Sequence, residues 1–218
     1  MTDNTPKSTI VTIADSRYFL PVFILVLSLK YHKVNAYIKI LGIQLTQNEK
    51  EFFTQFPNVE VFDANMNNQR SVVTRKAEAI LLAKNDDVKT ISLLDGDCIV
   101  NGDITQYLTK EIQGISTRWK DSKEDGMIYT QRGIYKNNDA EYGSIPASIL
   151  KVWQKDVGER EKSRLNNTVA SGNITINKNH LDFVETWHEQ MMKVLPKKKI
   201  KIAHDYSSDA YFQMDESV

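Results

Sequence analysis

The sequence predicts an α/β sandwich with a mostly parallel central sheet. Two observations favour this fold class. Short β-branched or alternating stretches, typical of strands, take turns with stretches of helix-forming content along the first half of the chain, and several apolar stretches stop at acidic residues. Alternating strands and helices form parallel sheets covered by helices. At 218 residues the chain is long enough for one large domain, and we expect residues 1–218 to form one.

The expected elements follow in a regular order up to residue 97. STIVTIAD at 8–15 is β-branched and reads as a buried strand, and the apolar residues 21–31 suit a helix packed on a sheet, with Pro21 tolerated in its first turn. The elements expected next are a strand at 36–43, a helix at 46–56 with Thr46 as cap and Glu49 three residues later, a strand at 58–64, a helix at 73–84 and a strand at 89–97.

The second half of the chain is less regular. Residues 117–148 are rich in Gly, Asp, Asn, Lys and Tyr and predict long loops near a site. The elements expected after them are a helix at 145–157, a strand at 170–177, a helix at 179–195 and a strand at 198–205.

Composition excludes several classes of protein. Lys plus Arg equals Asp plus Glu at 28 each, so no strong field favours nucleic acid or an anionic membrane. Cys98 is the only cysteine, which excludes an internal disulfide framework and fits a cytoplasmic setting. The most apolar stretch, residues 18–29, is shorter than the roughly twenty residues of a membrane span, so we expect no transmembrane segment.

The most informative motif is Asp95-Gly96-Asp97, at the end of the apolar run ISLL. In an extended chain the two carboxylates share one face about 7 Å apart, and the glycine admits a close backbone approach. Paired carboxylates are costly to bury unless a cation neutralises them, and hard oxygen ligands favour Mg²⁺ or Mn²⁺. Asp15 also ends a predicted strand, and ligands of such sheets collect there. The pattern therefore favours a divalent ion that holds a diphosphate.

A simpler interpretation of the motif is a polar turn between two strands, since Asp and Gly are common in turns. Three-residue motifs arise often by chance. The position of this one, after a continuous apolar run within an alternating α/β series, favours the ligand site.

Four blocks of the chain together resemble GT-A glycosyltransferases, in particular the group of glycogenin and the bacterial lipopolysaccharide galactosyltransferases. The blocks are TIADSRYFLPVFILVLSL, RKAEAILLA, ISLLDGDCIVNGDI and ASGNITIN. The resemblance implies a three-layer, Rossmann-like GT-A sandwich with a nucleotide-binding half at about 8–105 and a sugar-binding half at about 106–218. It also implies a metal-dependent glycosyltransferase (EC 2.4) that uses Mn²⁺ or Mg²⁺, a nucleotide-sugar donor, expected to be a UDP-sugar, and a glycan or lipid-linked sugar acceptor.

The same resemblance implies roles for individual residues. The nucleotide base is expected near three of them: Ala14, Asp15 and Tyr18. Two basic residues, Arg75 and Lys76, are expected to reach toward the donor. In the motif, Asp95 beside Gly96 is expected to contact the ribose or the metal, and Asp97 is expected to bind the metal on the donor diphosphate. The simpler alternatives are a core aromatic for Tyr18 and a solvated helix face for Arg75 and Lys76.

The chain also departs from the resemblance at several positions. Ala170 stands before Ser171-Gly172 where relatives have Asn or Asp, and Asp209 is followed by Ala210 where relatives have Gln. His204 is the expected third metal ligand. If the reaction inverts the anomeric centre, a carboxylate must accept the acceptor's proton, and Asp209 or Asp205 is the expected base.

Two other functions remain open. A nucleotidyltransferase also places acids beside a nucleotide, but it normally has a glycine-rich loop after the first strand, which ADSRYFLP lacks. A non-catalytic sugar-binding module with Ca²⁺ needs six to eight oxygen ligands, and only Asp103 lies near the pair in sequence.

Overall fold

The computed structural model describes residues 6–65, 75–85, 87–108, 115–119 and 169–194, together with the isolated residues 155 and 158. Within these ranges six strands form one sheet in the order β3-β2-β1-β4-β6-β5. The strands are β1 (Ser8–Asp15), β2 (Tyr37–Ile43), β3 (Val59–Asp63), β4 (Thr90–Leu94), β5 (Ile115–Trp119) and β6 (Val169–Asn177). β1 to β4 are mutually parallel where they pair, and β6 runs antiparallel to both β4 and β5.

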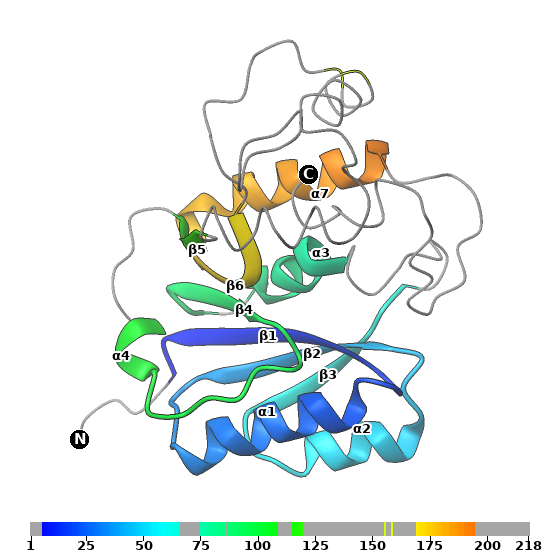
Figure 1. The fold of residues 1–218 in the computed structure, drawn as a ribbon, viewed down its shortest axis with the longest axis vertical. Coiled ribbons are helices and arrows are strands. Elements are labelled where there is room, and N and C mark those ends of the chain that lie inside the picture. Colours follow the sequence, from blue (N-terminus) through cyan, green and yellow to red (C-terminus); the bar gives the residue numbers. More distant parts are fainter. Residues whose placement is uncertain are drawn as a thin grey trace, which may run out of the picture.

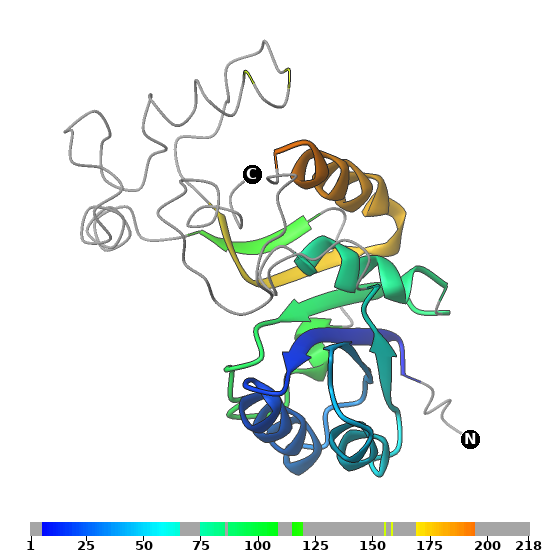
Figure 2. The same cartoon turned by 90° about the vertical axis from the view of Figure 1, so that its right-hand side faces the viewer.

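Helices cover both faces of the sheet (Figures 1 and 2). α1 (Phe19–Tyr31) and α2 (Gln47–Thr54) lie on one face, and α3 (Lys76–Leu81) and α7 (Leu181–Val194) lie on the other. The short elements are η3 (Leu82–Asn85), α4 (Thr105–Leu108) and η4 (Lys178–His180). The predicted α/β sandwich with a mostly parallel sheet is thus confirmed.

The side chains of β1 alternate between two apolar cores, one on each face. Ile10 and Ala14 pack in the core with α1 and α2, whereas Val11 and Ile13 pack in the core with α3 and α7. Successive residues of a strand point to opposite faces, so a strand covered on both sides reads as continuously apolar. This explains why residues 8–15 lack the polar alternation of a half-exposed strand.

α1 is apolar on nearly all sides. Four of its residues are buried against the sheet: Val22, Leu25, Val26 and Leu29. Full burial of such a side chain is worth about 1.5–3 kcal/mol, so this row holds the helix on β1 and β2. The helix begins at Phe19, two residues before the predicted start, and Pro21 lies in its first turn as expected.

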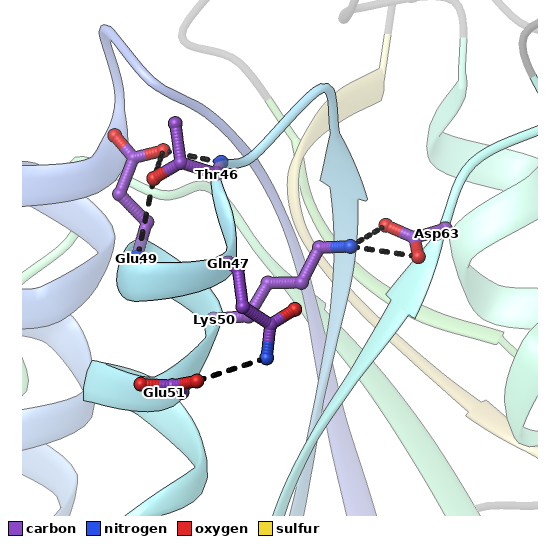
Figure 3. A network of polar contacts seen from close by, with 6 residues as sticks. All are labelled: Thr46, Gln47, Glu49, Lys50, Glu51 and Asp63. Carbon is purple, nitrogen blue, oxygen red and sulfur yellow. Dashed lines mark hydrogen bonds and ion pairs between the residues drawn. The ribbon is translucent and has the colours of Figure 1, made fainter.

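α2 begins with the predicted capping box (Figure 3). The hydroxyl of Thr46 accepts a hydrogen bond from the backbone N–H of Glu49, and the Glu49 carboxylate accepts one from the backbone N–H of Thr46. Further along the helix, Lys50 forms an ion pair with Asp63 at the end of β3. The first of these contacts satisfies N–H groups at the helix start, and the second ties α2 to its neighbouring strand.

Three predicted elements differ from the structure. The helix expected at 73–84 is a short α3 that tightens into η3, with residues 73–74 outside the described ranges. Residues 117–119, expected in a loop, belong to β5, which pairs with β6. The strand expected over 89–97 ends at Leu94.

Two other predicted elements lie outside the described residues, wholly or nearly so. All but one residue of the predicted helix at 145–157, and the whole predicted strand at 198–205, lie outside the described ranges. Within those ranges, no helix is both long enough and apolar enough to cross a membrane.

Candidate functional site

The candidate site lies where the chain changes direction across the sheet. From β1 the chain adds β2 and β3 on one side, and then returns to place β4 on the other side of β1. Ligands of open α/β sheets bind outside the carboxyl ends of the strands at such a point. The parallel strands β1 and β4 end at Asp15 and Leu94, so Asp15 and the Asp95-Gly96-Asp97 motif come to the same edge.

Asp15 is buried and organises the turn after β1. Its Oδ1 accepts hydrogen bonds from the backbone N–H of Arg17 at 3.0 Å and of Tyr18 at 2.8 Å. These contacts close a turn of the Asx type, in which an aspartate side chain accepts hydrogen bonds from the backbone a few residues on, and α1 begins directly after it at Phe19. One oxygen of Asp15 therefore has a structural role. A contact between Asp15 and the nucleotide base stays a prediction.

The motif itself forms a turn, so the expectation of an extended Asp95-Gly96-Asp97 segment is wrong. The backbone N–H of Cys98 donates to the carbonyl oxygen of Asp95 at 3.1 Å, which closes the turn. β4 pairs with β6 only as far as Leu94, and the N–H of Asp95 adds one more hydrogen bond to Gly172 at 2.9 Å. The chain then turns out of the sheet.

Gly96 allows the turn to pack closely against β1 and α1. A Cβ on Gly96 would lie 2.6 Å from Val22 Cγ2 and 3.2 Å from the backbone oxygen of Ile13, so no side chain fits there. The same position would lie 3.6 Å from the ring of Tyr18, which is partly buried at the edge of the α1 core. Tyr18 is therefore both a core aromatic and a neighbour of the motif.

The two motif carboxylates differ in their surroundings. The Asp95 side chain is 35% exposed, and its Oδ1 lies 3.0 Å from Nζ of Lys76, a residue of α3 that is almost fully buried. Asp97 is exposed, and within the described ranges its carboxylate has no ion pair. The motif thus presents one paired acid and one acid open to solvent.

The pKa of the Cys98 thiol responds to the negative charge of this turn. Burial raises the pKa of its thiol, and the charges of Asp95 and Asp97 raise it further. Both carboxylates are therefore within electrostatic reach of one thiol, and that thiol is not activated. Cys98 fits the role of a small, partly buried group behind the turn.

Arg75 and Lys76, adjacent in sequence, have different partners. Arg75 is 1% exposed, and its guanidinium contacts both carboxylate oxygens of Glu78 and the backbone oxygen of Asn65. It thereby links α3 to the segment after β3. The alternative of a solvated helix face is wrong for both residues, because both side chains are buried. Only Lys76 is seen to reach the motif, and a donor contact from Arg75 stays a prediction.

The remaining predicted site residues are not described. His204, Asp205 and Asp209 lie outside the described ranges, and at residues 170–171 only the backbone in β6 is described. Within the described part of the chain, no group of three or more His, Cys, Asp or Glu side chains is arranged to hold a metal ion.

A divalent ion nonetheless fits the chemistry of the motif. Mg²⁺ is commonly bound by one or two carboxylates together with waters and substrate phosphates, so two protein oxygens suffice. Asp97 and the second oxygen of Asp95 are the groups that would hold it. Lys76 already occupies the first oxygen, which limits Asp95 to one free oxygen.

Similarity to solved structures identifies the fold as the GT-A fold of glycosyltransferases. The apo structure of the bifunctional glycosyltransferase WbbM matches 100% of this chain with a TM-score of 0.59 at 15% identity. The galactosyltransferase LgtC, in complex with donor and acceptor sugar analogs, matches 88% of the chain with a TM-score of 0.51 at 14% identity. The apo form of the glycosyltransferase GlyE from Streptococcus pneumoniae matches 96% with a TM-score of 0.51 at 14% identity.

The chain spans only part of these proteins. It covers 38% of the WbbM chain, 67% of LgtC and 42% of GlyE. No protein-family model matches the sequence, and no curated protein matches it. At identities of 14–15% the similarity establishes the fold, and the activity is a separate question.

Proposed function

We propose that this chain is a metal-dependent glycosyltransferase that moves a sugar from a nucleotide-diphosphate sugar, a UDP-sugar by expectation, to a hydroxyl of a glycan or lipid-linked acceptor. The observation that carries the proposal is the Asp95-Gly96-Asp97 turn at the switch point of a GT-A sheet, with Lys76 bound to one of its acids. The LgtC structure, solved with donor and acceptor sugar analogs, supports the substrate class.

Charge balance supports a divalent ion in this site. Asp95 and Asp97 carry two negative charges, and the ammonium of Lys76 offsets one of them. A diphosphate beside the remaining negative charge would be repelled. A divalent cation on Asp97 and Asp95 reverses the sign of the site, and when bound it stabilises the charge that develops on the leaving diphosphate.

The transfer requires a place for one proton. The bond between the sugar C1 and the phosphate oxygen breaks, the acceptor oxygen bonds to C1, and the acceptor hydroxyl loses its proton. In an inverting reaction Asp209 or Asp205 would accept that proton, and in a retaining reaction the leaving phosphate would accept it.

His204 is proposed as the third metal ligand. The proposed site of the nucleotide base consists of Ala14, Asp15 and Tyr18.

The nucleotidyltransferase alternative is disfavoured by the turn after β1. A phosphate-binding loop offers free backbone N–H groups to a triphosphate. Here the N–H groups of Arg17 and Tyr18 are already bound by the carboxylate of Asp15.

The Ca²⁺-module alternative is disfavoured by Asp103, the acid expected to extend the pair. Its Oδ1 accepts a hydrogen bond from the backbone N–H of Thr105 at 2.9 Å, at the start of α4. Asp103 therefore serves that turn, and within the described ranges no third acid completes a calcium cluster.

Nucleotide-sugar hydrolysis tests the proposal without knowledge of the acceptor. Purified protein is screened with Mn²⁺ and a set of nucleotide sugars for release of the nucleoside diphosphate, and thermal stabilisation is measured with UDP and Mn²⁺, with ATP, and with Ca²⁺ alone. We expect hydrolysis of a UDP-sugar and stabilisation only by UDP with Mn²⁺. Stabilisation by ATP, or by Ca²⁺ alone, would support the alternatives instead.

Asp97→Ala is the decisive variant, and Asp182→Asn is its control. Asp97 is exposed, so its loss should leave the fold intact while abolishing hydrolysis and Mn²⁺-dependent UDP binding. Asp182 is an exposed acid in the first turn of α7, and its neutralisation should change neither. Undiminished turnover in Asp97→Ala would rule out the assignment.

A further inference from the structure

Gly172 lies opposite Asp95 in the antiparallel pair of β4 and β6. The last paired residues are Leu94 and Asn173, and the N–H of Asp95 then donates to the carbonyl oxygen of Gly172 at 2.9 Å. Among the described glycines, only Gly102 and Gly158 have a positive φ. The backbone of Gly172 is therefore one that any L residue adopts, and its conformation does not explain the glycine.

The neighbouring atoms explain why residue 172 is a glycine. A Cβ on Gly172 would lie 2.5 Å from Oδ2 and 3.3 Å from Cγ of Asp95. The first distance is too short for any carbon and oxygen that are not bonded, so the carboxylate would have to turn away. In the observed arrangement Oδ1 meets Nζ of Lys76 at 3.0 Å while Oδ2 rests against Gly172. Each oxygen of Asp95 thus has a defined neighbour.

We propose that Gly172 is a positioning residue for the Asp95 carboxylate. Because residue 172 has no side chain, Oδ1 can pair with Lys76 while Oδ2 stays over β6, as the oxygen left for a divalent ion shared with Asp97. This role rests on the proposed function, which supplies the ion and the donor diphosphate. Gly172 makes no side-chain contact with a substrate and acts through Asp95.

A side chain at residue 172 should disturb the geometry of the site and leave the fold intact. The atoms that must move are the end of a flexible side chain that is 35% exposed, so the fold can adapt. Gly42 of β2 provides a matched control in the same sheet. A Cβ there would lie 3.0 Å from Cδ1 of Leu45 and 3.2 Å from Cγ1 of Val61, both ends of apolar side chains outside the motif.

The experiment compares Gly172→Ala with Gly42→Ala in structure and in binding. A crystal structure of ligand-free Gly172→Ala should show that the Asp95 carboxylate has moved by more than about 0.5 Å, the tolerance of a preorganised site. Binding of UDP with Mn²⁺, measured by calorimetry, should weaken at least about tenfold in Gly172→Ala and stay within about twofold of wild type in Gly42→Ala. The melting temperature of Gly172→Ala should fall by less than about 4 °C.

A double variant separates positioning from a general effect. In the Asp95→Ala background the carboxylate is gone, so Gly172→Ala should weaken binding of UDP with Mn²⁺ by no more than about twofold. A carboxylate that stays in place in Gly172→Ala, or an equal loss in both backgrounds, overturns the positioning role. If the carboxylate moves but the wild-type protein neither binds UDP with Mn²⁺ nor hydrolyses any nucleotide sugar, the proposed function fails while the structural relation between Gly172 and Asp95 stands.

Discussion

Lys76 and Asp95 form an ion pair, with 3.0 Å between Nζ and Oδ1, that joins α3 to the carboxyl end of β4. The lysine side chain is 6% exposed and the aspartate side chain 35%. A buried ammonium needs such a partner, because an unpaired charge in an apolar setting is strongly unfavourable. The pair therefore links the packing of α3 on the sheet to the geometry of the candidate site.

Replacing Lys76 by Met should lower the free energy of unfolding by about 1–3 kcal/mol. The loss stays below that of a fully buried pair because Asp95 is partly exposed and can be hydrated. Urea unfolding of Lys76→Met, Asp95→Asn and the double variant measures this effect. We expect the two losses to be coupled by about 1 kcal/mol, whereas strictly additive losses would contradict the pairing.

Gly96→Ala should destabilise the protein by about 1–3 kcal/mol, since a new methyl group there meets a packed environment. The built Cβ lies 2.6 Å from Val22 Cγ2 and 3.2 Å from the backbone oxygen of Ile13, and the backbone cannot easily give way. Thermal and urea unfolding check the prediction, with Gly172→Ala for comparison because its obstructing neighbour is flexible. Equal stability of Gly96→Ala and wild type would mean that the turn is not packed as described.

Cys98 should react slowly with iodoacetamide near pH 8. Burial, and then the charges of Asp95 and Asp97, raise the pKa of its thiol, and only the thiolate reacts. Asp97→Asn removes one of these charges, so the pKa should fall and alkylation at pH 8 should become about two- to tenfold faster. Mass spectrometry over time measures the rate. Asp182→Asn serves as the control and should leave it unchanged.

Thr46→Ala should lower the free energy of unfolding by about 1 kcal/mol at pH 7, because it removes the cap of α2. Burial alone would raise the pKa of Glu49, but hydrogen bonds from Thr46 and Ser16 hold it below its usual value. A lowered carboxyl pKa stabilises the fold above the unfolded pKa, and this contribution disappears as the pH falls through the folded pKa.

The difference between wild type and Thr46→Ala should therefore narrow below about pH 4. Urea unfolding at pH 7 and at pH 3 measures it. Thr54→Ala, at the other end of α2, is the control, since its hydroxyl makes only a long contact of 3.5 Å with the backbone oxygen of Glu51. A difference that does not change with pH would contradict the role of Glu49.

Several local features follow directly from the sequence. Residues 8–15 were predicted as a strand and form β1 with the same bounds, because β-branched side chains have restricted χ1 angles and favour strands over helices. Thr46 and Glu49 were predicted as a capping pair and form one, because that interaction spans only three residues. Asp15 and Asp95 were expected at one edge of the sheet, and the parallel pairing of β1 and β4 puts them there.

Other features depend on contacts between distant segments. The Asp95-Gly96-Asp97 segment was expected to be extended, but packing of Gly96 against Val22 and Ile13 favours a turn. β5 was missed because its partner β6 begins fifty residues later at Val169, and local pattern carries no record of that pairing.

The amino-acid sequence by itself determined the α/β class, the order of strands and helices up to residue 94 and the place of Asp15 and Asp95 at one edge of the sheet, since these depend on side-chain periodicity and on contacts a few residues apart. Only the tertiary structure decided that Lys76 and not Arg75 meets Asp95, and that Gly172 lies against its carboxylate. The physical reason is that each of these contacts joins segments that are distant in the sequence. Only the packing of the sheet and its helices brings them together, and no local pattern encodes that packing.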